Sequence, residues 1–119
     1  MKTILAIDDD ADLLQIVTLA LQHAGYRVVS AINGREGLEF LGQLHPDLVL
    51  CDMVMPVLDG QGVYAAMQAD ESYQQIPLVL VSSAPHELMR ACPNALVLSK
   101  PFEIPMLLKV VHSLIGKGA

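Results

Sequence analysis

Short apolar segments that alternate with longer segments of helical spacing are the feature that most limits how this chain can fold. Each apolar segment is only four or five residues long and is almost uniformly hydrophobic, which is typical of a strand buried on both faces of a sheet. Five such segments occur, at residues 4–7, 28–32, 48–51, 78–81 and 95–98.

The segments between the predicted strands repeat their apolar residues with the spacing of an amphipathic helix. Residues 13–24, 38–44 and 107–115 show this spacing. Gly25 is placed to end the first helix, Asn33 to cap the second, and Pro105 to lie in the first turn of the last. Strand and helix therefore alternate from one end of the chain to the other.

This alternation predicts an α/β fold of three layers, in which helices cover both faces of a doubly wound, five-stranded parallel sheet. The chain has 119 residues and is 53% hydrophobic, which suits a single core. We expect one domain over residues 1–119.

Composition limits the partners and the compartment. A net charge of −6 and the lack of a basic run argue against direct nucleic-acid binding. The apolar runs are too short to span a membrane, and the N-terminus leads straight into a strand, so we expect neither a membrane segment nor a signal peptide. Cys51 and Cys92 lack metal-ligand spacing and make no disulfide framework, which favours a reducing, cytoplasmic setting.

Polar residues follow four of the five predicted strands. In an open parallel sheet, ligands bind at the carboxyl ends of the strands, so these side chains are expected to converge on one crevice. They are Asp8, Asp9 and Asp10 after the first strand, Asp52 after the third, Ser82 and Ser83 after the fourth, and Lys100 after the fifth.

The chemistry of this set points to phosphoryl transfer. Clustered carboxylates repel one another unless a hard divalent cation joins them, and Mg²⁺ suits oxygen ligands. Asp52 directly follows a buried run, so it is held rigidly and can act as a nucleophile. Lys100 and Ser82 can then neutralise and hydrogen-bond the phosphoryl oxygens.

With these residues the chain resembles a response-regulator receiver domain of two-component signalling, of the chemotaxis-receiver type. The resemblance covers essentially the whole chain. It rests on the segments at residues 4–10, 47–56 and 59–60, on Ile76 and Pro77 leading to Ser82, and on Lys100, Pro101 and Phe102.

The resemblance implies a flavodoxin-like strand order of 2-1-3-4-5, which the spacing alone does not supply. It also implies that Asp52 accepts the phosphoryl group and that Asp8 and Asp9 position Mg²⁺. The backbone carbonyl of Val54 would join the metal ligands, and Ser82 and Lys100 would contact the phosphoryl group. The donor would be a sensor histidine kinase or phosphotransfer protein. A downstream protein or a fused output domain would read the change.

Several residues also have simpler interpretations. Asp10 or Asp12 can be an ordinary N-cap. The spacing of Asp8, Asp10 and Asp12 resembles the start of a calcium loop, but Leu13 replaces the glycine which that loop requires. Ser83 could share the role of Ser82 if the end of the strand is bulged.

Three features depart from the family pattern. Val97 stands where the family usually has an aromatic residue, and the stretch from Ser82 to Lys100 is short by about one helical turn. We therefore expect a short fourth helix and an unusual output face. Val54 and Ala84 are apolar where fast self-dephosphorylating relatives carry polar side chains that orient water, which predicts slow loss of the phosphoryl group.

Two other functions compete with phosphoacceptance. One is a pseudo-receiver that docks partners without phosphorylation. The other is a phosphatase with an aspartate nucleophile, but that class needs a second aspartate where this chain has Val54. Under the favoured hypothesis the protein is not an enzyme, because it catalyses only its own phosphorylation and slow dephosphorylation.

Overall fold

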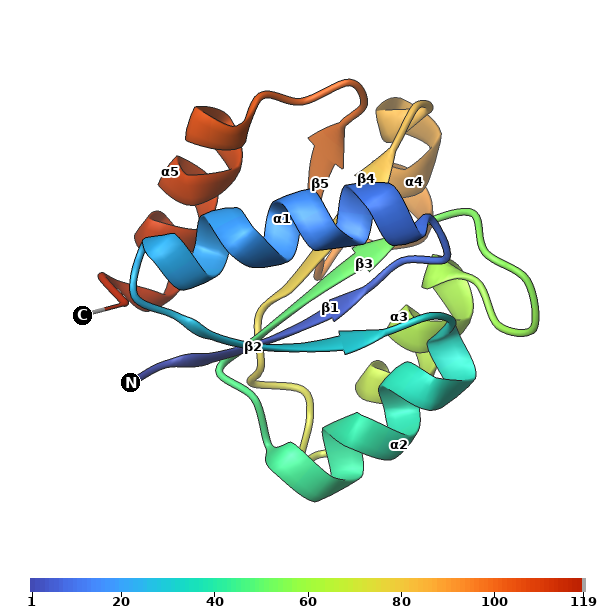
Figure 1. Cartoon of the computed structure of the whole chain (residues 1–119). Helices are drawn as coiled ribbons and strands as arrows, with labels where there is room; N and C mark the ends of the chain where they lie inside the picture. Colours follow the sequence, from blue (N-terminus) through green and yellow to red (C-terminus); the bar gives the residue numbers. More distant parts are fainter. Residues whose placement is uncertain (119) are drawn as a thin grey trace.

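A computed structural model of the protein describes residues 1–118, and within them five strands alternate with five helices. Figure 1 shows how these elements are arranged. The strands are β1 (Thr3–Ile7), β2 (Arg27–Ala31), β3 (Leu48–Asp52), β4 (Leu78–Ser82) and β5 (Leu96–Ser99). The helices are α1 (Ala11–His23), α2 (Gly34–Leu44), α3 (Gly60–Gln68), α4 (Pro85–Ala91) and α5 (Ile104–Ile115). Among these residues, no helix is long and apolar enough to cross a membrane.

The strands form one parallel sheet in the order β2-β1-β3-β4-β5. The predicted α/β class and the strand order that the resemblance implied are both confirmed. The predicted strand limits were inexact by one residue. Asp52 and Ser82 belong to the strands they were expected to follow, and the predicted second and fifth strands are each displaced by one position.

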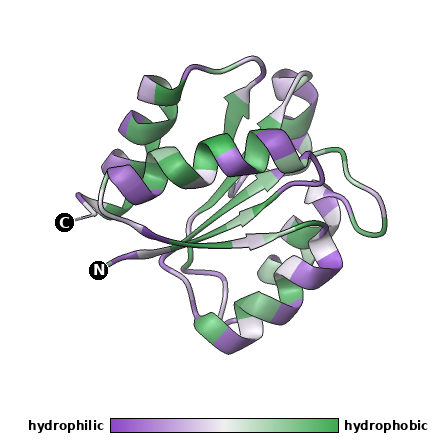
Figure 2. Cartoon of the chain, viewed as in Figure 1, coloured by the Kyte–Doolittle hydropathy of each residue, from purple (hydrophilic) through white to green (hydrophobic). Residues whose placement is uncertain are grey.

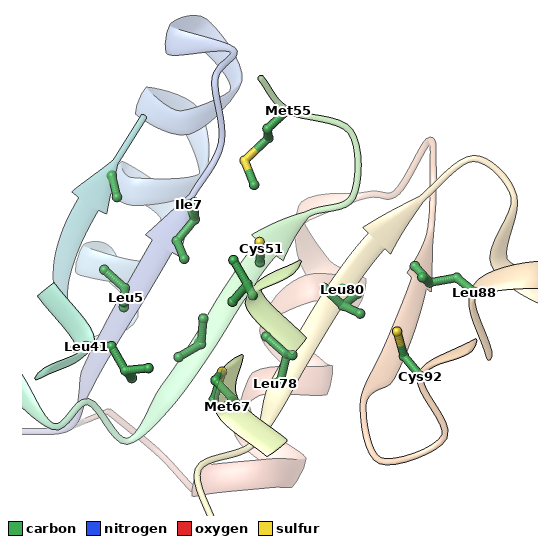
Figure 3. Packing of buried hydrophobic residues seen from close by; sticks show 13 residues of the cluster. Leu5, Ile7, Leu41, Cys51, Met55, Met67, Leu78, Leu80, Leu88 and Cys92 are labelled. Carbon is green, nitrogen blue, oxygen red and sulfur yellow. The ribbon is translucent and has the colours of Figure 1, made fainter. Parts of the chain in front are cut away.

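Successive residues of the inner strands face opposite layers, as the period of two in a strand requires. On one face, Ile4 and Leu50 pack with α1 and α5; on the other, Leu5 and Cys51 pack with α2, α3 and α4. Figure 2 shows hydrophobic strands inside and hydrophilic patches on the outer surfaces of the helices. Figure 3 shows the second cluster, in which Cys51 and Cys92 both lie among buried apolar side chains.

Polar side chains cap three of the helices. The carboxylate of Asp10 accepts hydrogen bonds from the N–H groups of Asp12 and Leu13, and Asn33 and Asp59 cap α2 and α3 in the same way. Asn33 was predicted as a cap, and Asp10 is the correct choice of the two acids considered for the first helix. Gly25 follows α1 with a φ of 97°, a conformation that favours glycine.

The fourth helix is short, as its connection predicts. α4 has seven residues, begins at a proline and has no side-chain hydrogen bond at its N-cap, Ala84. Leu88 is its buried residue. A helix this short is held mainly by packing, because few of its backbone groups are paired within it.

Candidate phosphoryl site

Asp52 is the last residue of β3 and lies at the centre of the carboxyl edge of the sheet. It pairs in register with Val81 of β4, and the N–H of Met53 donates to the carbonyl oxygen of Val81 at 2.9 Å. Only 6% of Asp52 is exposed. The sheet therefore holds this carboxylate in one place, with a small part open to an incoming group.

Two acidic residues from the end of β1 lie beside Asp52. One carboxylate oxygen from each of Asp8, Asp9 and Asp52 can be chosen so that all three lie within 4.8 Å of one another. Three oxygen ligands converging in this way fit Mg²⁺ better than a soft metal. The structure thus brings together the three acids that the sequence predicted as metal ligands, although their binding of a metal stays a prediction.

Asp8 and Asp9 differ in how far they are buried. Asp9 is exposed, whereas Asp8 is half-buried and accepts a hydrogen bond from the N–H of Asp10 at 2.9 Å. Burial raises the pKa of Asp8 above its ordinary value of 3.8, and the charges of Asp52 and Asp9 raise it further. The Asp10 N–H and Lys100 act in the opposite direction. Crowded negative charge of this kind is relieved when a cation binds.

Lys100 supplies a cation from the other side of the crevice. Its Nζ lies 2.5 Å from Oδ1 of Asp52, and its backbone N–H donates to the carbonyl oxygen of Ser82 at 2.8 Å. Burial alone would lower the pKa of Lys100, but the hydrogen bond to Asp52 and the charges of Asp52 and Asp8 outweigh it, so the pKa is raised. The ammonium group stays charged at neutral pH. The bond between Lys100 and Pro101 is cis.

Ser82 ends β4 and is almost fully buried, with 6% exposed, whereas Ser83 is exposed. The Ser82 hydroxyl oxygen accepts a hydrogen bond from the N–H of Ala84 at 2.9 Å. This bond anchors the start of the β4–α4 connection to the strand. If the Ser82 hydroxyl turned toward a phosphoryl group, this hydrogen bond would weaken. Because Ala84 is the N-cap of α4, the change would affect the start of that helix.

The loop between β3 and α3 carries Val54, which is 77% exposed. Two backbone hydrogen bonds pin the loop: Gly60 donates to the carbonyl oxygen of Met53 at 2.8 Å, and Gly34 to that of Leu58 at 3.2 Å. The contact at Gly34 had no counterpart in the sequence interpretation. A Cβ on Gly34 would lie 2.4 Å from the oxygen of Leu58, so only glycine fits there. The sequence feature that could have pointed to this close contact is the position of Gly34 directly after the Asn33 cap.

Val97 lies in β5, is partly buried and packs in the cluster that contains Leu88 of α4. Cys51 lies in the same cluster, and burial, together with the nearby charge of Asp52, raises the pKa of its thiol. A thiol in this state is a packing group and a poor nucleophile.

Fold and site together define a doubly wound α/β protein with an acidic crevice at the carboxyl edge of its sheet, in which a buried aspartate is paired to a lysine. A family model described as the response regulator receiver domain matches residues 4–112. The chain therefore belongs to the response regulator receiver domain family.

Two curated relatives that match this chain differ in how much of their own length it covers. The DNA-binding dual master transcriptional regulator RpaA of Synechocystis is 31% identical over 121 residues, which cover 98% of this chain and 50% of RpaA. This chain thus spans about half the length of that relative. The polar-differentiation response regulator DivK of Brucella ovis is 24% identical over 97% of both chains.

Solved structures of response regulators have a similar fold. The chemotaxis response regulator CheY4 of Vibrio cholerae has a TM-score of 0.87 at 30% identity and covers 96% of this chain and 98% of its own. The response regulator TrrA of Thermotoga maritima, in complex with Mg²⁺-BeF, has a TM-score of 0.86 at 27% identity and covers 96% and 99%.

Proposed function

We propose that this protein is a phosphoacceptor module in which Asp52 takes a phosphoryl group from a histidine of a sensor kinase or phosphotransfer protein. The main support is the position of the buried Asp52 carboxylate. It lies between an acidic pair and the ammonium group of Lys100, at the point where the strand order of the sheet reverses. This set provides a fixed nucleophile and flanking groups of both charges.

In the proposed reaction, an oxygen of Asp52 attacks phosphorus in line with the departing histidine nitrogen. The P–N bond breaks as the P–O bond forms, and the nitrogen keeps the electron pair. Lys100 is already beside Asp52, so its ammonium needs to shift only from the carboxylate to a phosphoryl oxygen. The Ser82 hydroxyl is the second donor, once it turns away from the Ala84 N–H.

Asp8, Asp9, Asp52 and the Val54 carbonyl are the proposed ligands of Mg²⁺, which when bound would neutralise charge on the phosphoryl oxygens. Support comes from the convergence of the three carboxylates and the exposure of Val54 at the start of the loop. In this proposal the protein is not an enzyme in the usual sense, since it acts only on its own phosphoryl group.

An apolar groove beside the crevice suits the protein that delivers the phosphoryl group. Leu13 and Ile16 of α1 line one side, and Lys100, Pro101, Phe102 and Ile104 line the other. A donor docked there would have its histidine next to Lys100. A cytoplasmic setting is part of the same proposal, because buried free thiols suit a reducing compartment.

The output is proposed to be a change of the surface that a downstream protein or fused domain reads, driven by one new charge. Val97 and the short α4 favour one alternative, a pseudo-receiver that docks partners without phosphorylation. The complete set of Asp8, Asp9, Asp52 and Lys100 weighs against that alternative.

The test is incubation with radiolabelled acetyl phosphate and Mg²⁺, with Asp52→Asn as the loss variant and the exposed Asp70→Asn as its matched control. We expect stable, Mg²⁺-dependent label in the wild type and in Asp70→Asn and none in Asp52→Asn. Equal labelling of all three proteins would disprove the acceptor assignment, and absence of label from all would favour the pseudo-receiver.

A further inference from the structure

A second surface hollow lies at the opposite edge of the sheet from Asp52. It is a groove of about 530 Å³ between the turn that joins α1 to β2 and the outer side of α5. In Figure 1 this region lies where the chain that follows α5 passes the turn between α1 and β2. We call it the α5 groove, and its principal lining residues are Tyr26, Pro105, Leu108, Lys109, His112 and Lys117.

The end of the chain builds one wall of the α5 groove. The buried Tyr26 donates its hydroxyl hydrogen to the carbonyl oxygen of Gly116 at 2.5 Å. Gly118 packs so closely on the turn that a Cβ would lie 2.6 Å from the carbonyl carbon of Gly25. The exposed Lys117 therefore lies between two anchored glycines and lines the groove.

The charge of this wall is opposite to that of the rest of the protein. From residue 104 onward the chain contains Lys109, His112 and Lys117 and no acidic residue, while all thirteen acids lie before it. Glu103, the nearest acid in sequence, precedes α5 and borders a separate hollow with Met106. Lys109 and His112 follow Pro105 at helical spacing, so the three share one side of α5.

The groove also offers apolar surface. The exposed Pro105 and the partly buried Leu108 contribute carbon surface beside the basic groups. An occupant that satisfies both parts carries negative charges and aliphatic side chains in alternation. A phosphodiester chain fits less well, because it lacks aliphatic groups that could cover Leu108 and Pro105.

We propose that the α5 groove is a docking site for an acidic, leucine-containing peptide segment of a partner protein. The carboxylates of the segment pair with Lys109 and Lys117, and its aliphatic side chains cover Leu108 and Pro105. The site is distinct from the phosphoryl crevice, and docking there needs no phosphorylation of Asp52.

The test uses a fluorescein-labelled peptide of repeated Glu-Glu-Leu units and measures its binding to the intact protein by fluorescence anisotropy. The loss variant is Lys109→Glu with Lys117→Glu. The matched control is Arg35→Glu with Arg90→Glu, which changes net charge equally at two exposed positions of α2 and α4. A Glu-Glu-Ser peptide, single-stranded RNA and vesicles of anionic phospholipid complete the comparison.

We expect the Lys109/Lys117 variant to bind the leucine peptide weaker by roughly tenfold or more, with the control near wild type. The serine peptide, RNA and vesicles should bind less well than the leucine peptide. Equal loss in both variants would reduce the effect to overall charge and overturn the proposal. Tighter binding of RNA or vesicles, or no binding of the leucine peptide, would overturn it as well. None of these outcomes depends on labelling of Asp52.

Discussion

The Nζ atom of Lys100 and the Oδ1 atom of Asp52 lie 2.5 Å apart, although Asp52 ends β3, Lys100 follows β5, and β4 lies between those two strands. Asp52 is nearly buried, with 6% of its surface exposed, and Lys100 keeps 33%. The lysine therefore balances the charge of Asp52 and lies where it could contact a group attached to that carboxylate. The same ion pair should therefore contribute both to the stability of the folded protein and to the proposed phosphoryl transfer.

Replacing Lys100 with methionine removes this cation and leaves Asp52 facing Asp8 and Asp9. Because Lys100 is partly exposed, solvent screens the pair, and we expect a loss of only about 1 kcal/mol in the free energy of unfolding. Urea unfolding without Mg²⁺ measures the loss. Added Mg²⁺ should restore much of the stability, and Lys2→Met, at an exposed site, should behave as wild type. Unchanged stability in the Lys100 variant would show that the pair contributes nothing at rest.

Asp8 predicts a pH dependence of stability in the absence of divalent metal. Burial raises its pKa in the folded protein above 3.8, so the folded state holds the proton more tightly than the unfolded state. Its contribution to stability is therefore greatest below pH 3.8 and is lost as pH rises through the raised pKa. Asp8→Asn should remove this decline, as measured by the difference in unfolding free energy between the two proteins across that range. A difference that stays constant with pH would contradict the shift.

Gly60 sets how closely α3 can approach β3, the strand that ends at Asp52. A Cβ there would lie 2.9 Å from both the carbonyl oxygen of Asp52 and the Cα of Met53, which are backbone atoms that cannot yield. Gly60→Ala should cost about 2 kcal/mol of unfolding free energy and slow phosphoryl uptake.

The matched control for that change is Gly42→Ala, at an exposed position in the last turn of α2. Its Cβ would meet only the Tyr73 hydroxyl, at an ordinary 3.4 Å, so we expect no loss and a gain of up to about 1 kcal/mol. Chemical denaturation compares the two variants. If both alanines act alike, the close approach at Gly60 is not what constrains the site.

The phosphorylated protein should lose its phosphoryl group slowly. Val54 and Ala84 flank the crevice with apolar side chains, so no side chain at either position can orient an attacking water. After removal of the donor, we expect the label on Asp52 to decay over many minutes in Mg²⁺ buffer. Val54→Gln should accelerate the decay, while Val57→Gln, an exposed change on the same loop, should not. A wild-type half-life of seconds would contradict this expectation.

The sequence predicted the strands well, and it grouped the candidate site residues, because both inferences depend on local patterns. Buried strands need uniform hydrophobicity, and the carboxyl edge of a parallel sheet collects whatever follows them. Asp8, Asp52 and Lys100 could thus be grouped from their positions at the ends of apolar segments. The third helix, at Gly60–Gln68, was not recognised from its spacing, because glycine and alanine give it a weak apolar stripe.

What the sequence could not supply depends on tertiary contacts and on unusual backbone conformations. Val57 has a φ of 72°, which a branched residue rarely adopts. It lies in a tight turn where the Leu58 N–H donates to the carbonyl oxygen of Pro56 at 2.8 Å. The contact of Gly34 with Leu58 holds that turn from another part of the chain. Neither feature follows from the hydrophobic pattern: the contact of Gly34 with Leu58 requires two distant segments to pack together, and the positive φ of Val57 is one that its residue type disfavours.

The most direct test of the account is to locate the phosphoryl group chemically. Borohydride reduces an aspartyl phosphate to homoserine, and tandem mass spectrometry of the digested protein identifies the residue. After incubation with acetyl phosphate and Mg²⁺, we predict homoserine at position 52 and unmodified aspartate at Asp8 and Asp9. Homoserine at Asp8 or Asp9, or its absence from the whole chain, would contradict the claim that Asp52 is the acceptor.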